Sequence, residues 1–160
     1  MIEEWPPAEL LDILIHPNDT LRQHAEEVSA FDSSLRDLAR CMRKTIEKSG
    51  VGLAAPQVGV SQRLIVVETP ELSLAIANPT ITAHSKRLIS IPEGCLSCPG
   101  VEVRIPRWDE IVVSGYDLEG ARRSLGLTLL NAIVFQHELD HLDGKLIVDA
   151  PVNERGEEHD

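Results

Sequence analysis

The stretch that decides the fold is TLLNAIVFQHELDHL, residues 128–142. Its apolar residues recur at the spacing of one helix face, and Asp143-Gly144 supplies a helix end. The shared face carries, in order, Leu129, Leu130, Ile133, Val134 and His137, and His141 follows one turn later. An apolar stripe that leads into two histidines predicts a packed helix with chemistry near its carboxyl-terminal end.

Within this helix, HELDH (137–141) matches the pattern H-E-x-x-H. Because the helical period puts His137 and His141 on one face, a turn apart, both imidazoles can reach one metal ion. Glu138 stands beside them, where it can reach a metal-bound water, and this is the general-base position of hydrolases with the motif. The alternative is a helix with two unrelated histidines and a solvated glutamate. The apolar stripe that leads into His137 favours the metal site.

Two histidines leave a catalytic metal site incomplete, because such sites usually have three protein ligands and one open position. The candidates for the third ligand are Cys95, Cys98, His84, Asp140 and Asp143. A thiolate is the best soft ligand for a transition metal, and both of these cysteines lie in EGCLSCPG, residues 93–100.

The C-x-x-C spacing of Cys95 and Cys98 allows three interpretations. A closed site of two cysteines and two histidines would be structural, but the chain between Cys98 and His137 is far longer than a zinc-finger linker. A redox pair should open a helix in a βαβ unit, whereas a Pro-Gly turn and a predicted strand follow here. One cysteine with two histidines leaves a position open for water and gives Glu138 a task, so we favour a catalytic site.

The other segments predict an α+β fold of mostly antiparallel sheets packed around this central HExxH helix. A second helix is predicted over 33–48, with Asp32 or Ser33 as its cap and Cys41 at or near its packing face. Three glycines and a proline predict a loop over 50–60. The predicted strands are 63–68, 72–78, 86–91, 101–105, 110–117, 121–127 and 145–150.

The two ends of the chain are predicted to be less regular. Residues 1–31 predict an arm with a strand or short helix over 10–15 and a turn over 20–26. Residues 151–160 predict a short polar, acidic tail. We expect residues 1–150 to form a single catalytic domain.

Composition narrows the classes of function. The chain has 160 residues, 42% of them hydrophobic, which is enough for one domain with its own core. A formal net charge of -11 argues against a basic face for nucleic acid. No apolar run approaches the ~20 residues of a membrane span, and no targeting signal is found, so we expect a cytoplasmic protein that does not enter a membrane. Three cysteines without signs of secretion argue against a disulfide framework and favour a metal or catalytic role.

Three segments, in this order, resemble the signature motifs of the peptide deformylases: GVGLAAPQVG (50–59), EGCLS (93–97) and QHELDHLDG (136–144). The resemblance runs from about residue 13 to residue 149. It implies the α+β fold of that family, with the HExxH helix packed among sheets. It also implies the family's activity, which is removal of the formyl group from the N-terminal formylmethionine of nascent polypeptides, with release of formate.

The resemblance assigns the metal ligands. Cys95 would bind the metal together with His137 and His141. Cys98 stands where the family usually has an aliphatic residue, and it would be a bystander. The family's single divalent metal is typically Fe2+ in cells, and Zn2+, Ni2+ or Co2+ can occupy its site.

The resemblance also implies the residues that act on the substrate, an N-formylmethionyl peptide. Glu138 would be the catalytic acid and base. The Gln57 side chain and the Leu96 backbone N–H would hold the reacting oxygen, and Gly52 would lie along the reaction site. The residues that match the family's methionine pocket are Leu130, Ile133 and Val134.

Two further expectations concern the surroundings of the site. Glu93 and Asp140 are expected to orient ligands or to pair with Arg107. Many bacterial deformylases end in an amphipathic helix that contacts the ribosome, whereas residues 150–160 are short and polar. We therefore expect no ribosome docking through a C-terminal helix.

Overall fold

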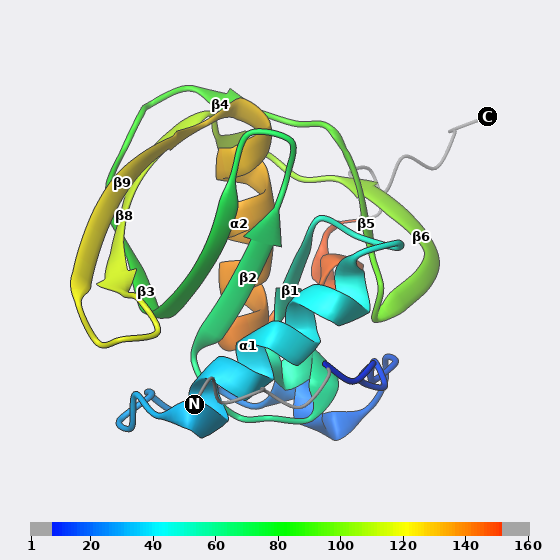
Figure 1. Cartoon of the computed structure of the whole chain (residues 1–160). Coiled ribbons are helices and arrows are strands. Elements are labelled where there is room, and N and C mark those ends of the chain that lie inside the picture. Colours follow the sequence, from blue (N-terminus) through cyan, green and yellow to red (C-terminus); the bar gives the residue numbers. More distant parts are fainter. Residues whose placement is uncertain (1–7, 152–160) are drawn as a thin grey trace.

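A computed structural model describes residues 8–151 of the chain (Figure 1). In chain order, with η for a 3₁₀ helix, its elements are η1 (Asp19–Arg22), α1 (Ser33–Ile46), β1 (Gly52–Ala54), η2 (Ala55–Val58), β2 (Leu64–Glu68), β3 (Ser73–His84), β4 (Leu88–Ile89), β5 (Pro92–Cys95), β6 (Cys98–Arg104), β7 (Arg107–Trp108), β8 (Glu110–Tyr116), β9 (Arg122–Thr128), α2 (Leu129–Leu142) and η3 (Ile147–Asp149). The predicted tail beyond residue 151, on which the expectation about ribosome docking rests, lies outside the described residues, as does the start of the N-terminal arm.

The main sheet is antiparallel, with the strand order β1-β2-β3-β8-β9. Two short antiparallel pairs, β4 with β7 and β5 with β6, accompany it. The register shifts twice between β3 and β8, and such irregularities bend a sheet. In Figure 1 the strands curve around α2. The predicted α+β class, with antiparallel sheets around the HExxH helix, is confirmed.

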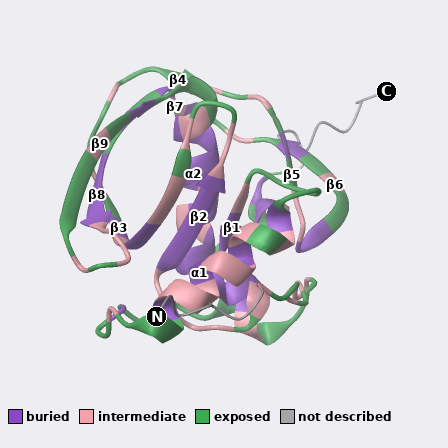
Figure 2. Ribbon diagram, in the orientation of Figure 1, coloured by how far each residue is buried: buried purple, intermediate pink, exposed green. Residues whose placement is uncertain are grey.

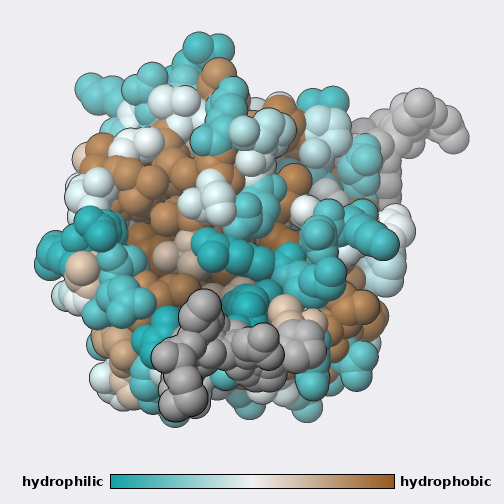
Figure 3. All heavy atoms as spheres, viewed as in Figure 1, coloured by the Kyte–Doolittle hydropathy of each residue, from teal (hydrophilic) through white to brown (hydrophobic). Residues whose placement is uncertain are grey.

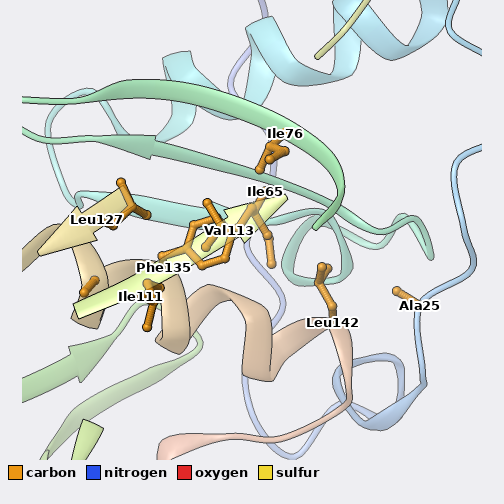
Figure 4. Close-up of a cluster of buried hydrophobic side chains, with 10 residues drawn as sticks. Ala25, Ile65, Ile76, Ile111, Val113, Leu127, Phe135 and Leu142 are labelled. Atoms are coloured by element: carbon orange, nitrogen blue, oxygen red, sulfur yellow. The ribbon is translucent and has the colours of Figure 1, made fainter. Parts of the chain in front are cut away.

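Helix α2 packs against one face of the main sheet through the central core cluster (Figure 4). Phe135 is fully buried and lies among Ile65 of β2, Ile76 of β3 and Val113 of β8. Each large apolar side chain buried in this way contributes about 1.5–3 kcal/mol. Because this packing fixes α2 relative to the sheet, it also fixes the two histidines of α2 relative to the strands.

Helix α1 covers the opposite face of β2. Strand β2 is buried on both sides, since Ile65 belongs to the cluster under α2 whereas Leu64 and Val66 pack with Met42 of α1 (Figure 2). Hydrophilic side chains cover the outer side of α1, while apolar surface gathers over the sheet beside it (Figure 3). The Asp32 side chain accepts a hydrogen bond from the helix backbone and caps α1, which confirms the predicted helix with an end two residues earlier.

The predicted loop over 50–60 is corrected by the structure. Residues 52–54 form β1, which pairs with β2 at the edge of the sheet, and η2 follows directly. The glycines that suggested a loop serve other purposes: Gly59 ends η2 at a φ of 84°, and Gly52 allows the strand to approach α2. A three-residue strand is stabilised by its partner and carries little periodic signal of its own.

The predicted closing strand over 145–150 is wrong. Residues 147–149 form η3, whose Asp149 carboxylate accepts the Leu146 backbone N–H at 3.0 Å and pairs with Arg22 at 2.7 Å. The apolar residues of this segment bury themselves in a small cluster rather than in a sheet. A side-chain cap and a distant ion pair have therefore overridden a short β-like pattern.

Other boundaries also differ from the predictions. No helix or strand forms over 10–15, where Leu14 donates a backbone hydrogen bond to Gln57 at 2.7 Å. The turn predicted over 20–26 is η1, and the strand predicted over 86–91 is reduced to β4. Strand β3 runs on to His84 because β8 pairs with its second half. In the range 8–151, no helix is long and apolar enough to cross a membrane.

Candidate metal centre and active site

The end of β5 and the last turns of α2 bring three ligand-bearing side chains together. One ligand atom from each of Cys95, His137 and His141 lies within 4.8 Å of the other two. The Cys95 Sγ atom is 3.3 Å from His141 Nε2. A thiolate with two imidazoles is the donor set of a transition-metal site that keeps a position open. These donors fit a single divalent ion.

The ring of His137 is oriented by a carboxylate. Its Nδ1 atom lies 3.0 Å from Oε1 of Glu93, a residue that is 6% exposed. This contact leaves the other ring nitrogen, Nε2, available to bind a metal ion and raises the basicity of the ring.

Glu93 is in turn held by Arg107 of β7. The guanidinium donates to both carboxylate oxygens, at 2.8 and 2.9 Å, and also reaches Asp140 of α2 at 3.0 Å. Burial raises the pKa of Glu93, but hydrogen bonds with His137 and Arg107 outweigh burial and hold that pKa below its usual value. The expected pairing of Glu93 and Asp140 with Arg107 is confirmed.

The two histidine ligands differ in their protonation when no ion is present. Burial, followed by the nearby charges of His137 and Arg107, lowers the pKa of His141 to about 3, so this ring is neutral and ready to bind a metal. Burial also lowers the pKa of His137, but hydrogen bonds with Cys95 and Glu93 outweigh it and raise that pKa to about 10. Metal binding therefore displaces a proton from His137.

Glu138 is buried next to the three candidate ligands, and one of its carboxylate oxygens has no hydrogen-bond partner within residues 8–151. The residue is 4% exposed, and the oxygen in question is Oε2. Burial is the largest cause that raises the pKa of Glu138 to about 7. A carboxyl group with a pKa near neutrality can both accept and return a proton, which is what general acid–base catalysis requires.

Gly52 of β1 faces Glu138 across the site. A Cβ atom at this position would lie 2.8 Å from Glu138 Oε1 and 3.0 Å from Val134 Cγ1. The absence of a side chain therefore lets the edge strand approach Glu138 and Val134 of α2.

A cleft opens beside Cys95, His137 and Glu138, and two further residues line it: Gln57 of η2 and Leu96 of the β5–β6 turn. Gln57 is 2% exposed, and its Nε2 atom lies 3.7 Å from Cys95 Sγ and 3.1 Å from Ser97 Oγ. Leu96 directly follows the ligand Cys95 in the chain. Both residues thus lie beside Cys95, one of the three candidate ligands.

The cleft over the metal centre has a volume of about 440 Å³. Three residues of α2 line it ahead of His137: Leu130, Ile133 and Val134. Ile133 and Val134 are buried, whereas Leu130 is 45% exposed. The cleft therefore has an apolar wall that ends at the ligands.

Cys98 lies outside the ligand cluster. Its side chain is 3% exposed and packs with Leu21 and Val103 in the small cluster next to η3. Burial, followed by the proximity of Cys95, raises the pKa of Cys98 to about 12, so it stays a neutral thiol. Of these two cysteines, Cys95 lies in the group of side chains that could hold a metal ion, and Cys98 lies outside that group.

One residue of the site was missed by sequence reasoning. Ser97 is fully buried and accepts the hydrogen bond from Gln57 Nε2. Its only sequence signal is its place as the last residue of EGCLS, because the contact joins positions forty residues apart.

The site thus combines three donors that suit a transition metal, a buried carboxyl group and a cleft with an apolar wall. These are the parts of a metallohydrolase of the HExxH class. Comparison with known proteins defines the family. Residues 10–156 match the family model described as Polypeptide deformylase, so the chain belongs to the polypeptide deformylase family. As a member of this family it is a metal-dependent hydrolase that removes the formyl group from the N-terminal formylmethionine of nascent polypeptides.

Individual relatives are similar over most of their length. A peptide deformylase of Picosynechococcus sp. is 42% identical over 158 residues, which cover 95% of this chain and 83% of the relative. The crystal structure of peptide deformylase from Thermotoga maritima superposes with a TM-score of 0.86 at 38% identity and covers 89% of this chain and 99% of its own. A Met-Ala-Ser-bound class I type b peptide deformylase from Acinetobacter baumannii gives a TM-score of 0.84 at 32% identity, covering 89% and 99% of the two chains.

Proposed function

We propose that Cys95, His137 and His141 hold one divalent metal ion at which the formyl group is hydrolysed. The observation that carries this proposal is the meeting of their three ligand atoms within 4.8 Å, at a cleft that Glu138 also lines with a carboxylate oxygen that has no partner among the described residues. When bound, the ion acts as a Lewis acid that polarises the formyl carbonyl and lowers the pKa of its water.

We propose that the metal ion bound in cells is Fe2+ and that Zn2+, Ni2+ or Co2+ can occupy the same site. Thiolate and imidazole donors accept all four metals, so the donor set alone does not select among them. Metal analysis of protein purified without oxygen tests the choice. Iron at one equivalent per chain supports the proposal, and a different metal at one equivalent under these conditions overturns it.

Glu138 moves the proton in this mechanism. Its carboxylate accepts a proton from the attacking water and then gives it to the leaving amine nitrogen. Burial supports both halves of this role, because a pKa raised to about 7 makes the protonated form accessible at working pH.

The Gln57 side chain and the Leu96 backbone N–H stabilise the oxygen on which negative charge develops. The 3.7 Å separation of Gln57 Nε2 from Cys95 Sγ supports this role for Gln57, since it puts a donor beside the metal centre. Donors fixed in advance are worth about 10²–10³ in rate each.

The substrate is an N-formylmethionyl peptide whose methionine side chain enters the apolar end of the cleft. Its wall is formed by Leu130, Ile133 and Val134, and Gly52 lies on the other side, next to Glu138. A related enzyme from Acinetobacter baumannii has been solved with Met-Ala-Ser bound, which supports a peptide that begins with methionine.

We also propose a domain organisation, a compartment and a class of partner for this enzyme. Residues 1–150 act as one catalytic domain, because the site draws on β1, η2, β5 and α2 together. The enzyme acts in the cytoplasm, where formylated chains emerge. It binds peptides rather than nucleic acid directly, in keeping with its net charge of -11.

The decisive assay measures formate released by the metal-loaded enzyme from a formyl-Met peptide. The expected result is stoichiometric formate and an intact internal peptide, with activity lost on chelation and restored by the metal. Cleavage of internal peptide bonds without formate would instead assign the HExxH site to a peptidase.

A further inference from the structure

The carboxamide of Gln57 is held at both ends. Its Oε1 accepts the Ala54 backbone N–H at 3.0 Å, while its Nε2 donates to Ser97 Oγ at 3.1 Å and faces Cys95 Sγ at 3.7 Å. Because a backbone N–H can only donate, the oxygen end of the amide is fixed on Ala54. The nitrogen end must therefore point toward Ser97 and the metal centre.

Ser97 is built into the scaffold rather than into the cleft. It is fully buried in the turn between β5 and β6, and its carbonyl oxygen accepts the His16 backbone N–H at 2.8 Å. The amide nitrogen of Gln57 carries two hydrogens. With one hydrogen on Ser97 Oγ, the plane of the amide is set and the other hydrogen is directed to the side where Cys95 lies.

We infer that Ser97 is a positioning residue for deformylation, which aims the second N–H of Gln57 at the developing oxyanion. This inference rests on the proposed role of Gln57. Ser97 acts through Gln57 because its own side chain is enclosed and cannot reach the substrate. Without the serine acceptor, the amide can turn about its last bond, and its nitrogen loses its fixed direction.

Ser97→Ala tests the inference. The expected result is a kcat lowered about tenfold, less than the 10²–10³ expected when the Gln57 donor itself is removed. KM and metal content should stay within twofold of the parent values, since Ser97 contacts neither substrate nor ligand set. A kcat within twofold of the parent, or loss of the metal from Ser97→Ala, would overturn the inference.

A double-mutant cycle with Gln57→Leu separates the two levels of the proposal. Once Gln57 is gone, Ser97→Ala should lower kcat no further. An equal loss in both backgrounds would mean that Ser97 does not act through Gln57. A Gln57→Leu enzyme with parent kcat would refute the proposed role of Gln57 itself. Should Ser97→Ala not fold, Ser97→Cys serves in both arms, because a thiol keeps most of the volume but accepts hydrogen bonds weakly.

A second, independent observation concerns the two neighbouring cysteines. Cys95 and Cys98 are direct register partners in the β5–β6 hairpin, and both are free thiols. Directly opposed residues have Cα atoms about 4.5–5.5 Å apart and side chains on the same face. This separation lies inside the range of about 4.4–6.8 Å that a disulfide requires.

The two thiols differ in access. Both cysteines line the cleft and contact the small cluster next to η3, but Cys95 is partly exposed whereas Cys98 is buried, with 3% of its surface exposed. A small oxidant that enters the cleft therefore meets Cys95 first. The third cysteine, Cys41, lies in α1 and takes no part in this hairpin.

We propose that Cys95 and Cys98 form a modification site for peroxides. The Cys95 thiolate attacks one oxygen of hydrogen peroxide, which breaks the O–O bond and gives a sulfenic acid and hydroxide. The Cys98 sulfur then displaces the sulfenic oxygen, the new S–S bond forms, and water leaves with the thiol proton. Together the two thiols lose two electrons and two protons, and these reduce one hydrogen peroxide to two waters. A dithiol reductant reverses the change.

Disulfide formation removes the thiolate from the metal centre, so the oxidised enzyme loses metal and activity together. Without Cys98, the sulfenic acid has no resolving thiol and proceeds to the sulfinic acid, which a dithiol does not reduce. The second cysteine thus converts a permanent loss of the ligand into a reversible one.

Hydrogen peroxide treatment of the metal-loaded enzyme tests this proposal. Peptide mass spectrometry should show a 95–98 link two hydrogens lighter than the dithiol, with release of one metal equivalent. Dithiothreitol and fresh metal should restore most of the activity. The same treatment of Cys98→Val should leave sulfinic acid at Cys95 and no recovery, while Cys41→Ser should behave like the parent. Sulfinic acid at Cys95 in the parent, or equal recovery of parent and Cys98→Val, would overturn the proposal.

Discussion

Cys95 belongs to the group of side chains that could hold a metal ion and Cys98 does not, and this difference gives the first prediction at the scale of single residues. Cys95→Ala should lose the metal or bind it at least tenfold more weakly, because a third of the ligand set is gone. Cys98→Val should keep one equivalent, because Cys98 lies outside the ligand cluster. Metal content after gel filtration measures both. Metal retained by Cys95→Ala and lost from Cys98→Val would show that the wrong sulfur has been assigned.

The burial of Glu138 predicts how activity depends on pH. The carboxyl group must be ionised to accept a proton, so kcat/KM should fall as the pH drops through the pKa of Glu138. That pKa is about 7 without the ion, and the positive charge of a bound metal lowers it, so the acid limb should lie at or below about 7. A pH–rate profile of the metal-loaded enzyme checks this. An acid limb well above 7, or none at all, would contradict the role of Glu138.

At the scale of elements, β1 must pass close to α2 at Gly52. Gly52→Ala should lower kcat/KM about tenfold or more, because the new Cβ would press on Glu138 and Val134, and overpacking of this kind costs about 1–3 kcal/mol. Gly126→Ala in β9 is the matched control, since its Cβ would meet no atom within 4 Å. Formate release by both variants makes the comparison. Equal activity of the two alanine variants would rule out a close approach at Gly52.

The ion pairs of Arg107 join β5, β7 and α2 behind the ligands. Arg107→Gln should destabilise the fold by about 1.5–3 kcal/mol, because the buried Glu93 carboxylate loses its two hydrogen bonds to the guanidinium and keeps His137 as its remaining charged partner. Arg123→Gln should change stability little, since Arg123 pairs with Asp117 in solvent. Urea unfolding of the metal-free proteins separates the two cases. Similar midpoints for both variants would mean that the buried network does not hold these elements together.

At the scale of the whole molecule, the metal should stabilise the fold. The proposed ligands come from β5 and from α2, so a bound ion would join the small hairpin to the central helix. An ion that is free at 100 times its Kd adds about 2.7 kcal/mol to the free energy of unfolding. Chelation should therefore lower the unfolding temperature of the parent and leave that of Cys95→Ala unchanged. An identical shift in both proteins would show that the stabilising ion binds elsewhere.

Much of the architecture was predictable from the sequence, because the patterns that define α2 and its histidine pair lie within short stretches of the chain. The apolar period of α2 and the i, i+4 spacing of its histidines already define a packed helix with two ligands. Four strands of the main sheet, β2, β3, β8 and β9, were predicted from alternating or continuous apolar runs. Choosing Cys95 over Cys98 required the motif resemblance, since spacing alone left both open.

The features that escaped prediction depend on distant partners. Strand β1 exists because β2 pairs with it, and η3 exists because Asp149 caps it and binds Arg22. The hydrogen bond from Gln57 to Ser97 appears only when η2 and the β5–β6 turn meet. None of these contacts produces a periodic pattern in the sequence, so none could be predicted from it. They do not involve the three candidate metal ligands.

The most direct test of the central claim compares formate release by the parent and Glu138→Ala, each loaded with one equivalent of the same metal. General acid–base catalysis contributes about 10²–10⁴ in rate, so kcat should fall by at least a hundredfold while metal content stays the same. A Glu138→Ala enzyme that binds its metal and releases formate at the parent rate would contradict the mechanism.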